Sequence, residues 1–285
     1  MTEPTTEAVL VTGAAGGIGA AAVRSLAGHG MRVYATVRGD DETSRSLAKI
    51  ANVRLITMDV SEPASVEAAV ETIRRESPAL RAVVNNAGVI VQGPLELVPP
   101  AELRRQFEVN TFGPAYVVQA FLPLLRAGGG RIVNVGAPTG RVAMPFLGPI
   151  SASKAALESF SNALRLELAA WNIPVSVIEP GSTQTRIFDK AGSAEKAARR
   201  LSDPQRVRLY ADHLARMDKA QAAMKQDPVQ PVADAIVHAV IARTPKRRYV
   251  VGGARAIGLL LKMPTGLRER LLMSSLGLRG VAAGR

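Results

Sequence analysis

The chain has 285 residues, no cysteine and a formal net charge of +12. Hydrophobic residues make up 47% of it, so we expect residues 1–285 to form a single packed α/β domain. The absence of cysteine excludes disulfides, thiolate catalysis and cysteine-ligated metal, and it fits a cytoplasmic location. The polar, acidic start of the chain does not resemble a signal peptide.

Short apolar runs alternate with helical patterns up to residue 179. Buried strands are expected at residues 7–12, 30–37, 53–58, 81–85, 131–135 and 174–179. Helices are expected between them, at 20–29, 41–50, 63–76, 100–126 and 151–171, with Ser61 capping the third and Pro114 and Pro123 bending or ending the fourth. A seventh strand is expected at 248–252. This order predicts a Rossmann-like, doubly wound, parallel seven-stranded sheet with helices on both faces.

The alternation stops after Pro180-Gly181. Residues 182–229 are polar and charged, with a helix expected over 204–224 and no strand. An insertion of this length between a strand and the next helix, here 231–241, is typical of a helical lid over an active site.

The C-terminal tail, residues 253–285, is basic and amphipathic. From Arg243 onward, ten lysines and arginines accompany one acid, Glu269, and leucines such as Leu261, Leu271 and Leu272 lie among them. We expect a solvated or subunit-facing end, with a peripheral membrane contact as the alternative. The lack of interleaved aromatic residues argues against nucleic acid.

A glycine-rich turn follows the first strand and opens the first helix: Thr12-Gly13-Ala-Ala-Gly16-Gly17-Ile18-Gly19. Glycines in this position let the backbone approach a pyrophosphate, which the N–H groups and dipole of the helix then favour. The spacing Gly-x-x-x-Gly-x-Gly differs from the standard dinucleotide fingerprint.

Further motifs follow in order, namely Asp59-Val60, Asn85-Asn86-Ala87-Gly88, Asn110 and Pro180-Gly181. With the glycine turn, they resemble the short-chain dehydrogenase/reductase family over about residues 7–252. Residues 33–38 and 141–148 are similar to its retinol and hydroxysteroid dehydrogenase branch. The resemblance implies an oxidoreductase that binds a nicotinamide dinucleotide and assembles as a homodimer or homotetramer.

The resemblance also implies which residues hold the cofactor. Asp59 would accept a hydrogen bond from the adenine amino group, and residues 86–88 would line the adenosine pocket. The full set is Thr12, Gly13, Gly17, Ile18, Gly19, Arg38, Asp59, Val60, Asn86, Ala87, Gly88, Lys154, Pro180, Gly181 and Thr183.

The second strand ends in Val37-Arg38 instead of an acid. An acid there would bind the ribose 2′-hydroxyl and repel a 2′-phosphate, whereas a guanidinium clamps a phosphate with several donors. We therefore predict NADP(H) in preference to NAD(H). Asp40 and Asp41 nearby leave open the alternative that Arg38 is only a surface charge.

Of the four catalytic residues that the resemblance implies, the sequence has two. In the family a tyrosine transfers the proton, a lysine four residues later lowers the pKa of that tyrosine and holds the ribose, a serine orients the substrate oxygen, and an asparagine holds a water. Asn110 and Lys154 match the asparagine and the lysine. Ile150 and Ala137 occupy the tyrosine and serine positions, and neither side chain donates a proton.

Few other groups are candidates for the missing donor. Ser151 forms a Ser-x-x-Lys pair with Lys154, but we expect it to cap the helix. Thr139 is a candidate replacement for the serine, and His213 is expected to be a solvated side chain of the lid. The sequence shows no metal-ligand constellation.

Three functions remain open. The first is an NADP(H)-dependent reductase of a hydrophobic small molecule, such as an iminium, imine or activated alkene, which needs no protein acid. The second is a non-redox biosynthetic catalyst (a cyclase, isomerase or dehydratase) that uses an apolar pocket. The third is a catalytically inactive, NADP(H)-sensing protein. The long lid implies a substrate to cover and favours an enzyme.

Overall fold

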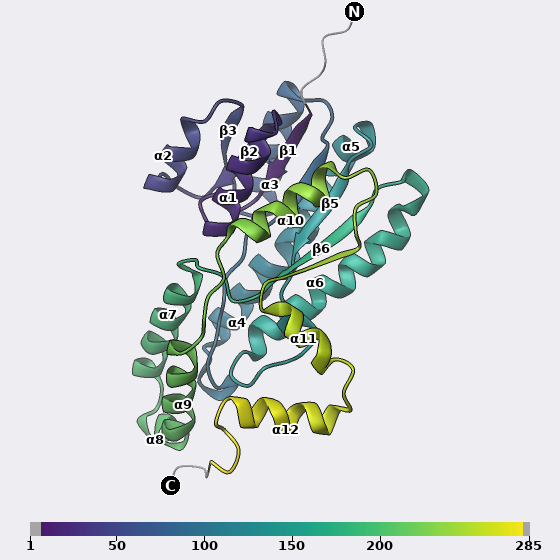
Figure 1. Cartoon of the computed structure of the whole chain (residues 1–285). Helices are drawn as coiled ribbons and strands as arrows, with labels where there is room; N and C mark the ends of the chain where they lie inside the picture. Colours follow the sequence, from purple (N-terminus) through teal and green to yellow (C-terminus); the bar gives the residue numbers. More distant parts are fainter. Residues whose placement is uncertain (1–6, 282–285) are drawn as a thin grey trace, which may run out of the picture.

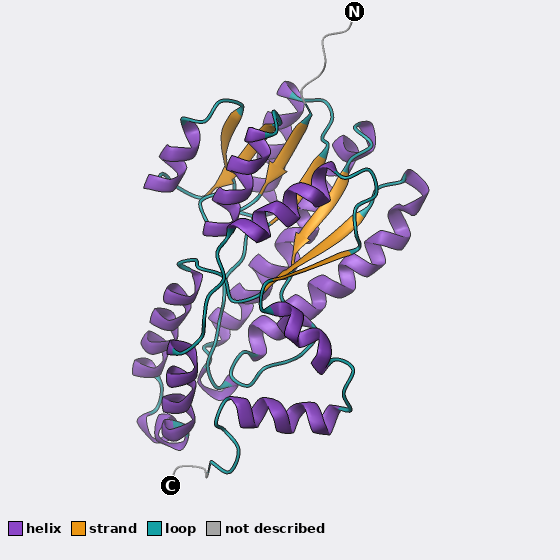
Figure 2. Ribbon diagram, in the orientation of Figure 1, coloured by secondary structure: helices purple, strands orange, loops and turns teal. Residues whose placement is uncertain are grey.

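One parallel sheet organises the structure, a computed structural model that describes residues 7–281. Its strand order is β3-β2-β1-β4-β5-β6-β7, with helices on both faces (Figures 1 and 2). The predicted Rossmann-like fold is confirmed. The order reverses between β1 and β4, where parallel sheets of this kind open a crevice at the carboxyl ends of their strands. The strands are β1 (Ala8–Val11), β2 (Arg32–Val37), β3 (Val53–Thr57), β4 (Ala82–Asn85), β5 (Arg131–Val135), β6 (Val175–Pro180) and β7 (Arg248–Val251).

Alternate side chains of the strands enter two separate cores. Val9 and Val11 pack with α1 (Gly17–Gly28) and α10 (Gln230–Ile241) on one face. Ala8 and Leu10 pack with α3 (Pro63–Glu76) and α5 (Gly113–Ala127) on the other. Because successive strand residues point to opposite faces, an uninterrupted apolar run is what a sheet covered on both sides requires. Of the remaining helices, α2 (Glu42–Ala48) packs beside β3 and α6 (Gly148–Glu167) beside β6, while α4 (Pro100–Phe107) packs against α6.

The segment expected as one helix over residues 100–126 has an irregular turn in its middle. A π-helical turn, η2 (Glu108–Phe112), lies between α4 and α5. Pro114 has no N–H group, so it cannot donate to the carbonyl of Asn110, its partner in a regular α-helix. Pro123 lies inside α5 and does not end it. The irregular turn therefore coincides with the predicted catalytic asparagine.

Residues 182–229 contain three helices instead of the one expected. They are α7 (Ile187–Leu201), α8 (Pro204–Leu209) and α9 (Ala211–Ala222), which form a layer beyond the sheet in Figure 1. The sequence pattern missed α7, because its buried positions are Ala191 and Glu195 and carry no large apolar side chain. Glu195 forms an ion pair with Arg199, which reaches Asp218 of α9 at 3.4 Å.

The two ends of this lid are fastened to each other. The N–H of Asp227 donates to the carbonyl of Ser182 (2.7 Å), and the N–H of Gln184 donates to the carbonyl of Asp227 (2.8 Å). The Asp227 carboxylate also accepts a hydrogen bond from the N–H of Gly253 at 2.8 Å. This short bridge forms a neck from which α7 to α9 extend.

The C-terminal tail forms α11 (Ala254–Leu260) and α12 (Thr265–Ser275). Pro264 directly precedes α12. Leu272 is buried while Leu271 is exposed. Within residues 7–281, no helix combines the length and the apolar character needed to cross a bilayer. Residues 282–285 of the predicted tail lie outside the described residues.

Candidate functional site

The glycine turn packs so closely against the segment after β4 that side chains at two of its glycines would clash with the protein. Gly13 has a φ of 64°, and a Cβ there would lie 2.7 Å from the Cα of Ala87. A Cβ on Gly19 would lie 2.7 Å from the Nδ2 of Asn86. Such a cradle, at the N-terminus of α1, fits the pyrophosphate of a dinucleotide.

Thr12 and Asn86 hold this turn against the end of β4. The Oγ1 of Thr12, which is buried, accepts hydrogen bonds from the N–H groups of Asn86 (2.9 Å) and Ala87 (3.0 Å). The Nδ2 of Asn86 donates to the carbonyls of Thr12 (2.9 Å) and Gly13 (3.1 Å). These two side chains thus bind the main chain of the turn and of the segment after β4. Ile18 packs against the core beside α1.

Thr185, which the sequence pattern did not single out, lies against the same turn. A Cβ on Gly17 would be 2.7 Å from the Cγ2 of Thr185. The start of the lid therefore rests on the glycine-rich turn. The position of Thr185, four residues after Gly181, could have indicated this contact. The segment that leaves β6 emerges at the carboxyl edge of the sheet, where the glycine-rich turn also lies.

Asp59 is ionised and held by Ser61. Its Oδ1 accepts hydrogen bonds from the N–H (3.0 Å) and the Oγ (2.6 Å) of Ser61. Burial opposes ionisation, but these bonds and the charge of Arg38 hold the pKa of the Asp59 carboxyl below its usual value. The expectation that Ser61 caps α3 is wrong, because its hydroxyl serves Asp59 and the N-cap residue is Glu62.

Val60 and Gly88 offer no side chain to a cofactor, because that of Val60 packs into the protein and Gly88 has none. The Val60 side chain is buried, and its Cγ2 lies 2.8 Å from where Gly113 would carry a Cβ. A Cβ on Gly88 would lie 3.5 Å from the Oδ1 of Asn110. In these two positions the backbone is the part left for a cofactor.

Arg38 is exposed at the end of β2 and forms no ion pair within residues 7–281. The two nearby acids have other partners. Asp40 pairs with Arg45 at 3.1 Å. Asp41 caps α2 by accepting a hydrogen bond from the N–H of Ser44 at 2.8 Å. The guanidinium of Arg38 is therefore available to a ligand.

The four predicted catalytic positions lie on elements that pack together. The Oγ1 of Thr111 in η2 donates to the carbonyl of Ser153 in α6 at 3.0 Å. A Cβ on Gly140, which ends the turn η3 (Pro138–Gly140), would be 2.8 Å from the carbonyl carbon of Lys154. The elements η2, η3 and α6 thus bring together Asn110, Ala137, Ile150 and Lys154.

The side chain of Asn110 is fully used by the protein. Its Oδ1 accepts from the N–H of Val89 (2.8 Å), and its Nδ2 donates to the carbonyl of Val89 (2.9 Å). Asn110 is completely buried. It braces the chain just after β4, and its main-chain carbonyl lacks the regular α-helical donor, because Pro114 has no N–H.

Lys154 is buried beside the apolar positions. Its Nζ donates to the carbonyl of Val135 at 2.7 Å, at the end of β5. Burial lowers the pKa of Lys154 to about 8. Ile150, one helical turn earlier, is 6% exposed, and Ala137 follows Val135 by two residues. The ammonium group of Lys154 therefore lies near the hydrocarbon side chains of Ile150 and Ala137, which occupy the predicted tyrosine and serine positions.

Ser151 does not cap α6, contrary to expectation. The helix begins at Gly148, and Pro149 in its first turn favours this earlier start. Ser151 is buried inside the helix, and its Oγ has no hydrogen-bond partner within residues 7–281. The same holds for the Oγ1 of Thr139.

His213 is not the solvated side chain expected. Its ring packs against Phe146 and Tyr210, with centroid distances of 6.2 and 6.5 Å. Phe146 has a φ of 60°, a left-handed conformation that costs energy for a bulky residue, and its carbonyl accepts from the N–H of Gly93 at 2.7 Å. These aromatic contacts join α9 to the chain that enters α6.

Pro180, Gly181 and Thr183 shape the start of the lid. A Cβ on Gly181 would lie 3.0 Å from the backbone nitrogens of Gly253 and Ala254. Thr183 is buried, and its Oγ1 donates to the carbonyl of Gly181 at 3.0 Å. The Thr183 side chain therefore stabilises this turn.

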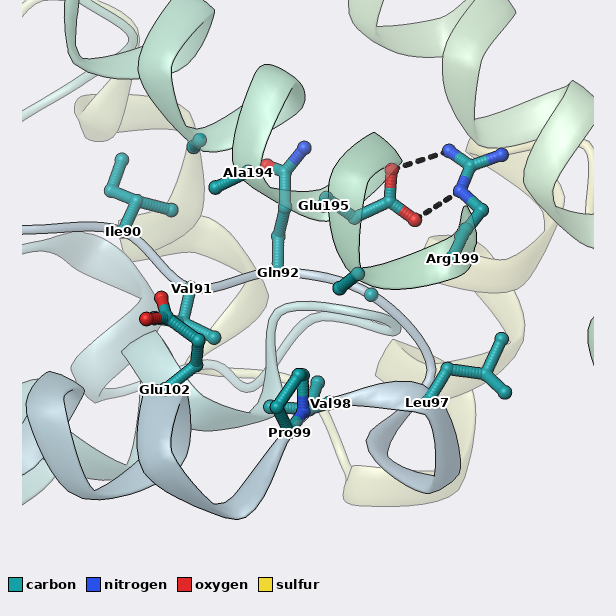
Figure 3. Close-up of a pocket in the computed structure, with 13 residues that line it drawn as sticks. Ile90, Val91, Gln92, Leu97, Val98, Pro99, Glu102, Ala194, Glu195 and Arg199 are labelled. Carbon is teal, nitrogen blue, oxygen red and sulfur yellow. Dashed lines mark hydrogen bonds and ion pairs between the residues drawn. The ribbon is translucent and has the colours of Figure 1, made fainter. Parts of the chain in front are cut away.

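A small cavity separates α7 from the loop after β4 (Figure 3). Its walls are mainly apolar, and Figure 3 shows the Glu195 carboxylate facing Arg199 at its edge. Glu102 also lines it and pairs with Arg105 at 2.6 Å. The cavity is lined by Ile90, Val91, Gln92, Gly93, Leu97, Val98, Pro99, Glu102, Ala191, Ala194, Glu195, Ala198 and Arg199. The described part of the chain contains no cluster of three or more histidine or acidic side chains arranged for a metal ion.

Known proteins share both the sequence and the fold. Residues 7–196 match the family model for short chain dehydrogenases. An NADPH-dependent 3-dehydrocapnine reductase of Ornithobacterium rhinotracheale is 35% identical over 252 residues, which cover 85% of this chain and 87% of that protein. The 11-beta-hydroxysteroid dehydrogenase type 2 of Homo sapiens is 34% identical over 286 residues, covering 94% and 70%. A short chain dehydrogenase of Burkholderia cenocepacia, solved in complex with NADP, is 25% identical with a TM-score of 0.72 and covers 95% of this chain and 97% of its own. The chain therefore belongs to the short-chain dehydrogenase/reductase family of oxidoreductases.

Proposed function

We propose that the chain is an NADP(H)-dependent reductase of a hydrophobic small molecule that needs no protein acid, such as an iminium, an imine or an activated alkene. The observation that carries this proposal is the apolar pair Ala137 and Ile150 beside the buried Lys154. During hydride transfer, a substrate carbonyl oxygen beside Ala137 and Ile150 would gain negative charge, and neither side chain could donate a hydrogen bond or a proton to it. An iminium already carries its positive charge, and a conjugated alkene can take its proton from water.

The preference for NADP(H) rests on the end of β2. Arg38 is exposed and without an ion pair in the described residues, while Asp40 and Asp41 have other partners. A relative is named NADPH-dependent, and a solved neighbour holds NADP. Titrations of the protein with NADPH and NADH test the preference, and tighter NADH binding would contradict it.

The residues of the chain would divide the work as follows. The cofactor, when bound, supplies the hydride. The glycine turn and the N-terminus of α1 would hold its pyrophosphate. The Lys154 ammonium donates one N–H to the carbonyl of Val135, and its other two N–H groups would donate to ribose hydroxyls. Ala137 and Ile150 would orient an apolar substrate and exclude water from it.

A substrate panel tests the reaction. Single-turnover oxidation of NADPH would be measured with matched cyclic iminium, enone and ketone compounds. We expect the iminium or the enone to react and the ketone to react slowly, since a missing general acid typically costs about 10²–10⁴-fold. Ketone turnover at the rate of the iminium would contradict the proposal. Conversion of a substrate without NADPH oxidation would favour the non-redox alternative instead.

A further inference from the structure

We propose that Arg186, at the start of the lid helix α7, is a second ligand for the 2′-phosphate of NADP(H), beside Arg38. The inference rests on the proposed preference for NADP(H) and adds a residue from the lid to that site. Arg38 alone was predicted from the sequence.

The lid places Arg186 beside the phosphate-binding turn. Its neighbour Thr185 touches the glycine turn, with Cγ2 2.7 Å from where Gly17 would carry a Cβ. Arg186 is the residue that precedes the first turn of α7, and it is exposed. A long side chain that starts one residue from this contact can reach a ligand lying on the turn.

The charge of Arg186 acts on the same surface turn as Arg38. A hydrogen bond from the N–H of Ser44 is the main cause that lowers the pKa of Asp41, and the nearby positive charge of Arg186 lowers it further. Asp41 follows Arg38 by three residues, in the turn that leads into α2. Arg186 forms no ion pair within residues 7–281, so its guanidinium is available to a ligand.

A 2′-phosphate explains why two arginines are needed. The group carries close to two negative charges at neutral pH. It would lie near Asp40 and Asp41, which repel it. Arg45 already offsets Asp40 at 3.1 Å, whereas Asp41 has only neutral hydrogen-bond partners and the charge of Arg186. A guanidinium from the lid would offset this repulsion and offer paired N–H donors to the phosphate.

The experiment compares ligands with and without the 2′-phosphate. Dissociation constants for NADPH, NADH, adenosine 2′,5′-bisphosphate and AMP would be measured calorimetrically for the wild type, Arg186→Gln and Arg38→Gln. Lys190→Gln is the matched control, an exposed cation one turn later on the same helix. Arg186→Gln should weaken NADPH and the bisphosphate by about tenfold or more, and leave NADH and AMP unchanged.

Each alternative result decides a specific point. Unchanged NADPH binding by Arg186→Gln would overturn the role of Arg186. Equal weakening of NADPH and NADH would also overturn it, because a loss shared by both cofactors indicates a contact with the pyrophosphate. If the wild type prefers NADPH and Arg38→Gln abolishes the preference while Arg186→Gln does not, only this inference fails. If the wild type prefers NADH, the proposed cofactor itself fails. Arg186→Lys keeps the positive charge without the paired N–H donors of a guanidinium, so it should recover part of the NADPH affinity. Its thermal unfolding should match that of the wild type.

Discussion

The ammonium of Lys154 donates a hydrogen bond to the main-chain carbonyl of Val135, with 2.7 Å between Nζ and the oxygen. The lysine thus has a partner within the protein that does not depend on a tyrosine. Its position next to hydrocarbon side chains has a thermodynamic consequence, because burial lowers its pKa from 10.5 to about 8.

The first prediction concerns stability against pH. The folded protein releases its Lys154 proton near pH 8 and the unfolded chain near 10.5, so the unfolded state binds more protons between these values. The wild type should therefore gain stability relative to Lys154→Met as the pH rises from about 8 to about 10.5, by about 3 kcal/mol. Urea unfolding across this range measures the difference. Lys190→Met, at an exposed position, should show no such divergence, and parallel curves for Lys154→Met would contradict the prediction.

The second prediction concerns the missing acid pair. Ile150→Tyr combined with Ala137→Ser should raise the rate of ketone reduction by about 10²–10⁴-fold, because the tyrosine hydroxyl would restore a proton donor beside Lys154. Ile150→Phe with Ala137→Ser keeps the ring without the hydroxyl and is the control. Equal rates for the two double variants would show that the positions do not face the substrate.

The third prediction tests the contact between the lid and the glycine turn. Gly17→Ala should weaken NADPH binding roughly tenfold, since the new methyl group would overlap the Cγ2 of Thr185. Thr185→Ser removes that methyl group. The double variant should recover affinity in part, and calorimetric titration of all four proteins forms a double-mutant cycle. Strict additivity would mean that the two residues do not touch.

The fourth prediction concerns the buried carboxylate of Glu179. Its side chain is 1% exposed and pairs with Arg141 at 2.6 Å and with Arg248. Glu179→Gln should reduce the free energy of unfolding by about 2–3 kcal/mol, because Arg141 loses its charged partner in a partly buried place and Arg248 keeps only its ion pair with Glu158. Glu71→Gln is the matched control, as Glu71 pairs with Arg74 at 2.9 Å on the surface and should have no measurable effect in urea unfolding. A loss as small as that of the control would show that the ion pairs do not contribute.

The strands were predictable because each is a short, mostly apolar run, and the observed bounds differ from the expected ones by at most two residues. Helix α7 was not predictable from apolar periodicity, since its buried face consists of alanine and an ion-paired glutamate. The two predicted serine caps failed for local reasons. Ser61 binds Asp59, and Pro149 lets α6 begin before Ser151.

The site was predictable in its positions and not in its contacts. Motif spacing located Asn110 and Lys154, but their partners Val89 and Val135 come from other elements and leave no local signal. Thr185 was missed for the same reason, since its contact with Gly17 joins segments far apart in the sequence. The roles of the predicted site residues remain predictions that the variants above test.

The neck between Ser182 and Asp227 makes the lid an exchangeable module. Both ends of the insertion are held by main-chain hydrogen bonds that no side chain of the segment supplies. Loop-closure entropy rises only slowly with length, so a longer or shorter segment grafted onto the same neck would change the cost of closure by well under about 1 kcal/mol per doubling. Substrate range in this scaffold can therefore diversify by transplanting residues 187–226, while the sheet and the contacts of Thr185 and Arg186 stay as they are.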